Sequence, residues 1–124
     1  MHIEVVTVSH SEINCDKVEE SSAEIRKRVI AAREIQLRRF AGMGIHSNAM
    51  MNSAMLRHLC PLSSEVRALL ESAMSRLNLS ARAYDRIIKV ARTIADLAGS
   101  ENIEAMHIAE AINYRTLDRD SWGR

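Results

Sequence analysis

Residues 81–98 constrain the fold of this chain more than any other stretch, because their apolar side chains recur at helical spacing. Spacings of three and four residues place these side chains on one face of an α-helix. The members of this stripe are Tyr84, Ile87, Ile88, Ala91, Ile94, Ala95 and Ala98. Arg82, Arg86 and Lys89 fall on another face. We therefore expect an amphipathic helix that packs on one side and exposes a basic ridge on the other.

Four further segments have helix signals at their ends, over residues 21–40, 48–60, 64–77 and 104–115. A serine precedes four of the five expected helices, where its hydroxyl can accept a hydrogen bond from the first turn. These serines are Ser21, Ser47, Ser63 and Ser80. Because the chain has only four glycines and one proline, it has few turn-forming residues for a fold of many strands. The predicted fold class is all-α, a small bundle of about five helices.

The run HIEVVTVS, residues 2–9, is the one segment typical of a β-strand. A single strand cannot form a sheet, so it either pairs with another copy or belongs to a larger α/β protein. We favour the second interpretation. The expected organisation is a last core strand with a polar connector over residues 1–20, a helical domain over 21–115 and a tail over 116–124.

The net charge of +1 conceals a separation of charge along the chain. Residues 1–20 hold five acidic residues against one lysine, whereas residues 21–40 hold six basic residues against two acidic ones. Four of the basic residues form a candidate surface for nucleic acid or for another subunit: Arg26, Lys27, Arg33 and Arg39. Two Glu–Arg pairs at i, i+4 in the same segment favour a solvated helix face instead, and no group of aromatic residues is present to stack on bases. Both interpretations stay open.

The motifs that would give this chain a reaction of its own are missing from the sequence. It lacks a phosphate-binding loop and a zinc-protease motif, and His58 and Cys60 have no further ligand at a regular spacing. Cys15 and Cys60 form no CxxC pair, which favours a reducing, cytoplasmic location. No apolar run reaches the roughly 18 residues that a membrane span needs. We expect neither catalytic residues nor a metal site in this chain.

Arg82 and Arg86 lie in the first two turns of the helix expected over residues 81–98. The amino end of a helix carries positive potential, so cations there cost about 0.3–1 kcal/mol. An anion held jointly by the helix end and the arginines would account for their position. Pairing with a carboxylate such as Asp85 would account for it equally well, and the spacing alone leaves both explanations open.

Three stretches together resemble a known family: ESSAEIRKRVIAAREIQLRRF, LSARAYDRIIKVARTIADLAGS and HIAEAINYRTLD. They look like the C-terminal region of magnesium-chelatase-like AAA+ ATPases of the ComM/YifB type, and the resemblance covers nearly the whole chain. It implies that residues 21–115 form the helical lid that follows an α/β ATPase core with a P-loop and a Walker B acid. Residues 2–9 would be the last strand of that core, and the chain an excised fragment that is not an enzyme on its own.

The resemblance also implies nucleotide-binding residues. Such proteins place a sensor 2 arginine at the start of a lid helix, and the Ser-x-Arg that opens residues 81–98 puts this role on Arg82. Arg86 would support it or contact a neighbouring subunit. The implied cofactor of the full-length protein is ATP with Mg²⁺, the implied partners are its own core and the other subunits of a hexamer, and the implied activity is DNA branch migration. Two alternatives stay open, a free-standing helical DNA-binding module and a subunit-assembly module.

Overall fold

The computed structural model describes residues 1, 3, 5 and 19–122, and within this part of the chain it contains five α-helices, one 3₁₀ helix and no strand. The α-helices are α2 (Ser22–Arg39), α3 (Ser53–Leu59), α4 (Ser64–Leu77), α5 (Ala81–Leu97) and α6 (Ala105–Trp122), and the 3₁₀ helix η1 spans Asn48–Met50. The all-helical prediction is confirmed for these residues. The strand expected over residues 2–9 lies outside the described residues, apart from positions 3 and 5.

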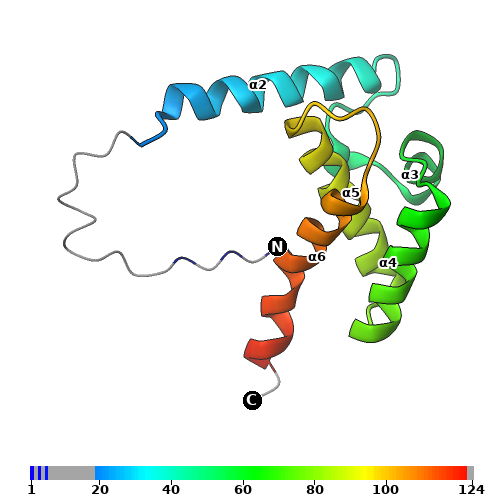
Figure 1. Cartoon of the computed structure of the whole chain (residues 1–124). Coiled ribbons are helices and arrows are strands. Elements are labelled where there is room, and N and C mark those ends of the chain that lie inside the picture. The colour runs from blue at the N-terminus through cyan, green and yellow to red at the C-terminus, as the bar shows by residue number, and fades with distance from the viewer. Residues whose placement is uncertain (2, 4, 6–18, 123–124) are drawn as a thin grey trace, which may run out of the picture.

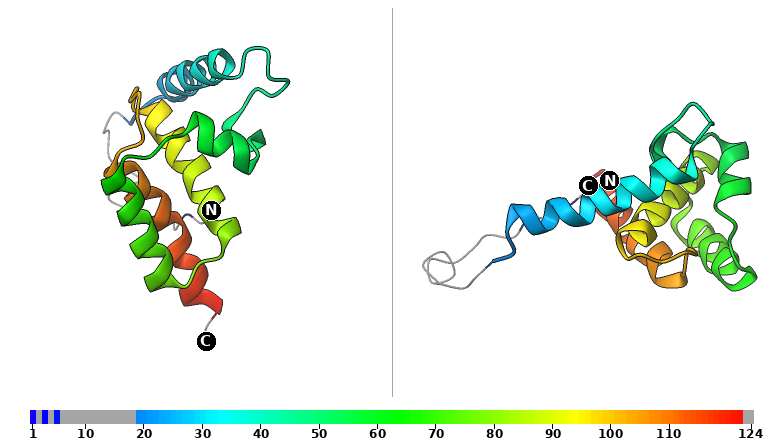
Figure 2. Two further views of the ribbon diagram at one scale, coloured as in Figure 1. Left: turned by 90° about the vertical axis from the view of Figure 1, so that its right-hand side faces the viewer. Right: turned by 90° about the horizontal axis from the view of Figure 1, so that it is seen from above.

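Helix α5 lies at the centre of the bundle, where it contacts α2, η1, α3 and α6. Helix α4 packs against α6 (Figure 1). Helix α2 crosses one end of α5, and its amino-terminal half extends past the other helices (Figure 1; Figure 2, right). Among the described residues, no helix is both long and apolar enough to span a bilayer.

The apolar stripe of α5 faces the core, as its periodicity predicts. Ile87, Ile88, Ala91 and Ala95 are buried, whereas Ala98, just past the helix end, is exposed. The least exposed large apolar side chains around the stripe are Phe40, Leu70 and Ile108. Removal of this apolar surface from water is the main force that holds the helices together.

Three of the expected serine caps are present. The hydroxyl oxygens of Ser21, Ser63 and Ser80 accept hydrogen bonds, each 3.3 Å long, from the backbone N–H three residues further on. Each bond satisfies one of the N–H groups that lack a partner within the helix. Local sequence therefore sets where α2, α4 and α5 begin.

The prediction of a single helix over residues 48–60 is wrong, because the chain forms η1 and α3 there with a break at Met51. Ser47 makes no capping hydrogen bond with its side chain. Asn52 caps α3 instead, since its Oδ1 accepts from the N–H of Met55 at 2.9 Å. Asparagine favours cap positions because its side chain competes for backbone N–H groups, and this competition divides the segment in two.

The last helix extends further than expected. Residues 104–115 were predicted to be helical, and α6 runs on to Trp122, so the expected tail over 116–124 is helical through most of its length. The segment between Ala105 and Trp122 contains neither glycine nor proline, so nothing local ends the helix at Arg115. At the other end, Nδ1 of the buried His107 accepts from the N–H of Glu104 at 2.9 Å and takes the place of a cap.

Asn78 ends α4 in the left-handed conformation, with φ at +49°. Its N–H donates to the carbonyl groups of Met74 and Ser75. Because a β-carbon is strained at positive φ and asparagine tolerates this better than alanine, we expect Asn78→Ala to lower the free energy of unfolding by about 1 kcal/mol. Asn78→Gly is expected to leave it unchanged or raise it. Urea unfolding of the two variants tests this, and equal losses in both would contradict it.

Candidate functional site

Arg82 and Arg86 project from the amino end of α5 and are exposed. Neither makes a hydrogen bond or an ion pair within the described residues. The carboxylate considered as a neutralising partner, Asp85, forms no ion pair with either arginine within the described residues, and its Oδ2 accepts from the Ser53 hydroxyl at 2.6 Å. Two cations therefore lie beside the positive end of a helix without an ion-pair partner in this part of the chain. This arrangement favours an anion from outside the domain.

A groove of about 890 Å³ runs between α5 and α6, and Arg86 lies on its edge. Its lining is mainly apolar, with Val90, Ile94 and Leu97 from α5 and Ala111 from α6. Lys89 and Arg115 add positive charge to Arg86. The structure thus places Arg86 in the groove, while Arg82 is not among its lining residues.

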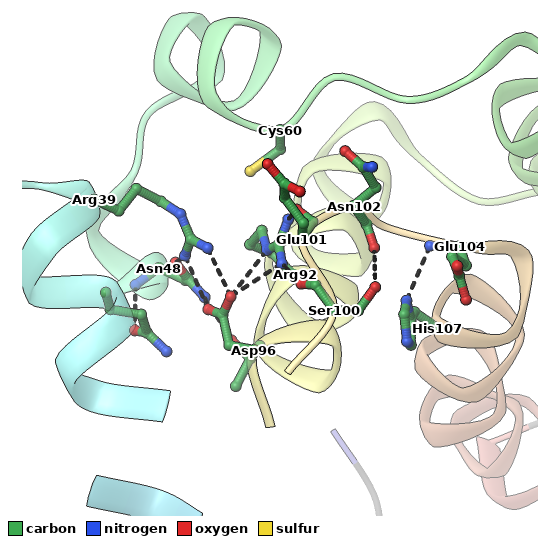
Figure 3. A network of polar contacts seen from close by, with 12 residues as sticks. Arg39, Asn48, Cys60, Arg92, Asp96, Ser100, Glu101, Asn102, Glu104 and His107 are labelled. Carbon is green, nitrogen blue, oxygen red and sulfur yellow. Dashed lines mark hydrogen bonds and ion pairs between the residues drawn. The ribbon is translucent and has the colours of Figure 1, made fainter. Parts of the chain in front are cut away.

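A buried polar network joins α2, η1 and the carboxyl end of α5 (Figure 3). The Asp96 carboxylate, which is fully buried, accepts two hydrogen bonds from Arg39, at 2.6 and 2.9 Å. It also accepts from Asn48 Nδ2 at 2.9 Å and from Arg92 Nε at 3.1 Å. One carboxylate therefore holds two guanidinium groups from different helices, which is a charge-assisted geometry.

Further hydrogen bonds of this network reach the loop that follows α5 and the side chain of Gln36. Arg92 donates to the carbonyl groups of Ser100 and Glu101 at 2.7 and 2.9 Å. The backbone N–H of Asn48 donates to Oε1 of Gln36, which is itself buried in α2. The network thus fixes the position of α2 on α5 and the start of the α5–α6 connection together.

The structure removes Arg39 from the candidate nucleic-acid surface, because its side chain is bound to Asp96 and only 15% exposed. Arg26, Lys27 and Arg33 are exposed on α2 and keep their place in that prediction. Their neighbour Arg28 pairs with Glu20. The sequence interpretation failed for Arg39 because it grouped Arg39 with Arg26, Lys27 and Arg33 on one candidate surface. The signal it missed is that Arg39 lies seven and three residues after two buried positions of α2, Ala32 and Gln36.

Arg92 and Asp96 were also missed as a buried pair. Each directly follows a core residue of the stripe, Ala91 or Ala95, so both lie at its margin. A pair of opposite charges at i, i+4 beside an apolar stripe is a signal that could have identified them.

The Asp96 carboxyl is stabilised in its charged form. Burial raises its pKa, but hydrogen bonds from Arg39 and Asn48, with the charges of Arg39 and Arg92, outweigh burial and hold the pKa below its ordinary value. The same hydrogen bond raises the pKa of Arg39 despite partial burial.

Stability should therefore depend on Asp96 at acid pH. A folded-state pKa below the unfolded value of about 3.9 contributes stability that is fully present above that pH. The contribution is lost as the pH falls through the folded-state pKa. We expect the free energy of unfolding to fall as the pH drops below about 4, and the Asp96→Asn variant to lose less over the same range. Urea titrations at several pH values measure this, and an identical acid loss in both proteins would contradict it.

Cys60 does not form a reactive or ligating site with His58. Its thiol is buried, its Sγ lies 4.0 Å from the sulfur of Met51, and burial raises its pKa although Arg92 and Arg39 oppose this. No group of three or more His, Cys, Asp or Glu side chains is placed to bind a metal ion within the described ranges.

The chain belongs to the family described as "Magnesium chelatase, subunit ChlI C-terminal", whose model matches residues 19–115. It is similar to the competence protein ComM of Haemophilus influenzae, at 44% identity over 100 residues, and to the uncharacterized protein YifB of Escherichia coli, at 45% over 100 residues. An uncharacterized protein of Mycobacterium bovis is 35% identical over 96 residues, or 77% of this chain.

The matches to ComM and YifB cover 81% of this chain but only 19% of each relative. The chain therefore spans about a fifth of the length of these curated relatives. The family resemblance predicted from the three sequence stretches is confirmed, and the chain corresponds to the C-terminal domain of the longer proteins.

Proposed function

We propose that this chain is the helical lid of a ComM-type AAA+ ATPase, and that Arg82 is its sensor 2 residue. The observation that supports the proposal is the pair of exposed arginines at the amino end of α5, neither of which forms an ion pair within the described residues. In a full-length cytoplasmic protein, ATP and Mg²⁺ would be held mainly by the core. The lid would contribute donors to the phosphates.

The chemistry of this end suits a triphosphate. The guanidinium of Arg82 can donate two parallel hydrogen bonds to phosphate oxygens, and the positive potential at the amino end of α5 favours the same anion. The Mg²⁺ ligands would come from the ATPase core and from the nucleotide phosphates. Arg86, one turn further on, would bind the same nucleotide or a neighbouring subunit.

The proposed lid works by gaining and losing one contact. While the γ-phosphate is present, Arg82 holds α5 close to it. Hydrolysis and phosphate release remove this acceptor, so α5 and the helices packed on it are free to rotate away from the core. In a ring, which we propose to be a hexamer, this rotation would displace the next subunit.

A domain replacement tests the proposed class of function. The Haemophilus influenzae ComM protein would be prepared intact, without the stretch that matches this chain, and with that stretch replaced by this chain. We expect ATP hydrolysis to be lost on deletion and restored by the replacement. Undiminished hydrolysis in the deleted protein, with its fold intact by circular dichroism, would contradict a role as lid.

Contact with DNA is a second candidate function, favoured by Arg26, Lys27 and Arg33, which are exposed on α2. Three phosphate contacts would give a slope of log affinity against log salt of about −2.7. Fluorescence anisotropy with a labelled duplex measures this slope. Reversal of the three charges should abolish binding by the 124-residue chain, whereas reversal of the exposed Arg76 on α4 should not. Equal effects of both changes would exclude a specific surface on α2.

A further inference from the structure

The core-facing stripe of α2 continues beyond the core. Ile25, Val29, Ala32 and Gln36 follow a spacing of four, three and four residues, so they share one face of the helix. Ala32 and Gln36 are each 4% exposed, whereas Val29 is 45% and Ile25 44% exposed. The half of α2 that carries these two residues is the half that extends past the other helices (Figure 1; Figure 2, right). The helix therefore keeps a packing face where the described bundle gives it nothing to pack against.

This uncovered face adjoins the groove between α5 and α6. A hollow of about 290 Å³ lies under α2, lined by Val29, Arg33 and Leu97 among others. Ala49, Thr93 and Leu97 line both the hollow and the groove, so the two are adjacent. We call the combined surface the notch: the Ile25–Val29 face of α2, the hollow beneath it and the α5–α6 groove.

The polar groups around the notch are mainly cationic. Arg33, Arg86, Lys89 and Arg115 line it. Among the described lining residues the one carboxylate is Glu110, whose Oε1 accepts from the Tyr114 hydroxyl at 2.9 Å. The Nε of Arg115 is buried and has no hydrogen-bond partner in the described part of the chain. A surface with an apolar centre and cationic side chains at its edge is complementary to a protein surface that is apolar at its centre and acidic at its edge.

We infer that the ATPase core of the longer protein docks on the notch. This inference rests on the lid function proposed above. In the curated relatives about four fifths of the chain lies outside the matched C-terminal domain, so an occupant of sufficient size is covalently present. Arg86 lines the groove and is also a residue of the candidate nucleotide site. The nucleotide phosphates would therefore lie at the edge of the interface between the notch and the core.

Hydrogen–deuterium exchange tests the inference, with the isolated chain compared with the ComM protein that carries it as its C-terminal domain. We expect backbone N–H groups in residues 22–31 to exchange at least tenfold more slowly in the longer protein, because docking would suppress local opening of α2. Val29→Glu should restore the faster exchange of the isolated chain. Ile30→Glu is the matched control, since Ile30 is 47% exposed and about 100° around the same helix.

Three results would overturn the inference. One is equal exchange of residues 22–31 in the two proteins, and another is an equal effect of Val29→Glu and Ile30→Glu. The third is a dimer of the isolated chain in light scattering that Val29→Glu dissociates, because the occupant would then be a second copy. The Arg82→Ala variant separates this inference from the lid function. If Arg82→Ala abolishes hydrolysis while Val29→Glu causes no docking defect, the proposed lid function stands and the proposed docking of the core on the notch is wrong.

Discussion

Replacement of Asp96 by alanine is expected to lower the free energy of unfolding by about 3–5 kcal/mol, the usual cost of removing one partner from a buried ion pair. The Asp96 carboxylate is the acceptor for Arg39, Asn48 and Arg92 in the buried network. Without this carboxylate, the guanidinium groups of Arg39 and Arg92 remain largely buried with no negative charge beside them. A loss of this size is a large share of the roughly 5–15 kcal/mol that stabilises a typical domain.

Urea unfolding followed by circular dichroism measures this loss. Asp85→Ala on the same helix is the matched control, because Asp85 makes one hydrogen bond, to Ser53, near the surface, and should cost at most about 1.5 kcal/mol. The network accounts for the packing of α2 on α5 only if the Asp96 variant loses much more than the Asp85 variant. Comparable losses would show that the helices are held by apolar packing alone.

Replacement of Arg82 by alanine is expected to lower ATP turnover by roughly 10²–10³-fold in the ComM protein that carries this chain, the usual effect of removing one donor to developing charge. Arg82 is exposed and unpaired within the described residues, so its removal breaks no contact of the fold. Unfolding of the isolated variant should therefore match that of the parent chain. The large effect would be on chemistry and not on stability.

Two substitutions calibrate this result. Arg82→Lys keeps the charge but not the paired donors, so we expect partial activity. Arg76→Ala removes an exposed arginine from the carboxyl end of α4 and should leave turnover unchanged. A turnover in Arg82→Ala equal to that in Arg76→Ala would remove Arg82 from the mechanism.

The helices that could be predicted are those whose signals are local. Caps at Ser21, Ser63 and Ser80 and the apolar stripe of α5 depend on residues within a few positions of each other, so the sequence carries them directly. The break before α3 escaped prediction because two plausible caps, Ser47 and Asn52, compete within five residues and the asparagine prevails.

The buried network could not be predicted for a different reason. Arg39 and Asp96 are 57 positions apart. The spacing of Arg39 from Ala32 and Gln36 can place it on the packing face of α2, but it cannot identify the partner. Its partner depends on how α2 crosses α5, which is a property of the packed bundle. The position of the two arginines at the start of α5 could be predicted, because it follows from the local sequence of the helix, and the fold leaves both side chains exposed. Their nucleotide role remains a prediction of the family resemblance.

The affinity for ATP relative to that for ADP tests the central claim most directly, because sensor 2 contacts the phosphate that the two nucleotides do not share. Calorimetry would compare a non-hydrolysable ATP analogue with ADP in the ComM protein that carries this chain and in its Arg82→Ala variant. A charged hydrogen bond contributes about 1.5–3 kcal/mol, so we expect Arg82→Ala to weaken the analogue roughly 10- to 100-fold and to leave ADP affinity unchanged. Equal weakening of both nucleotides, or of neither, would contradict the assignment of Arg82 as the γ-phosphate sensor.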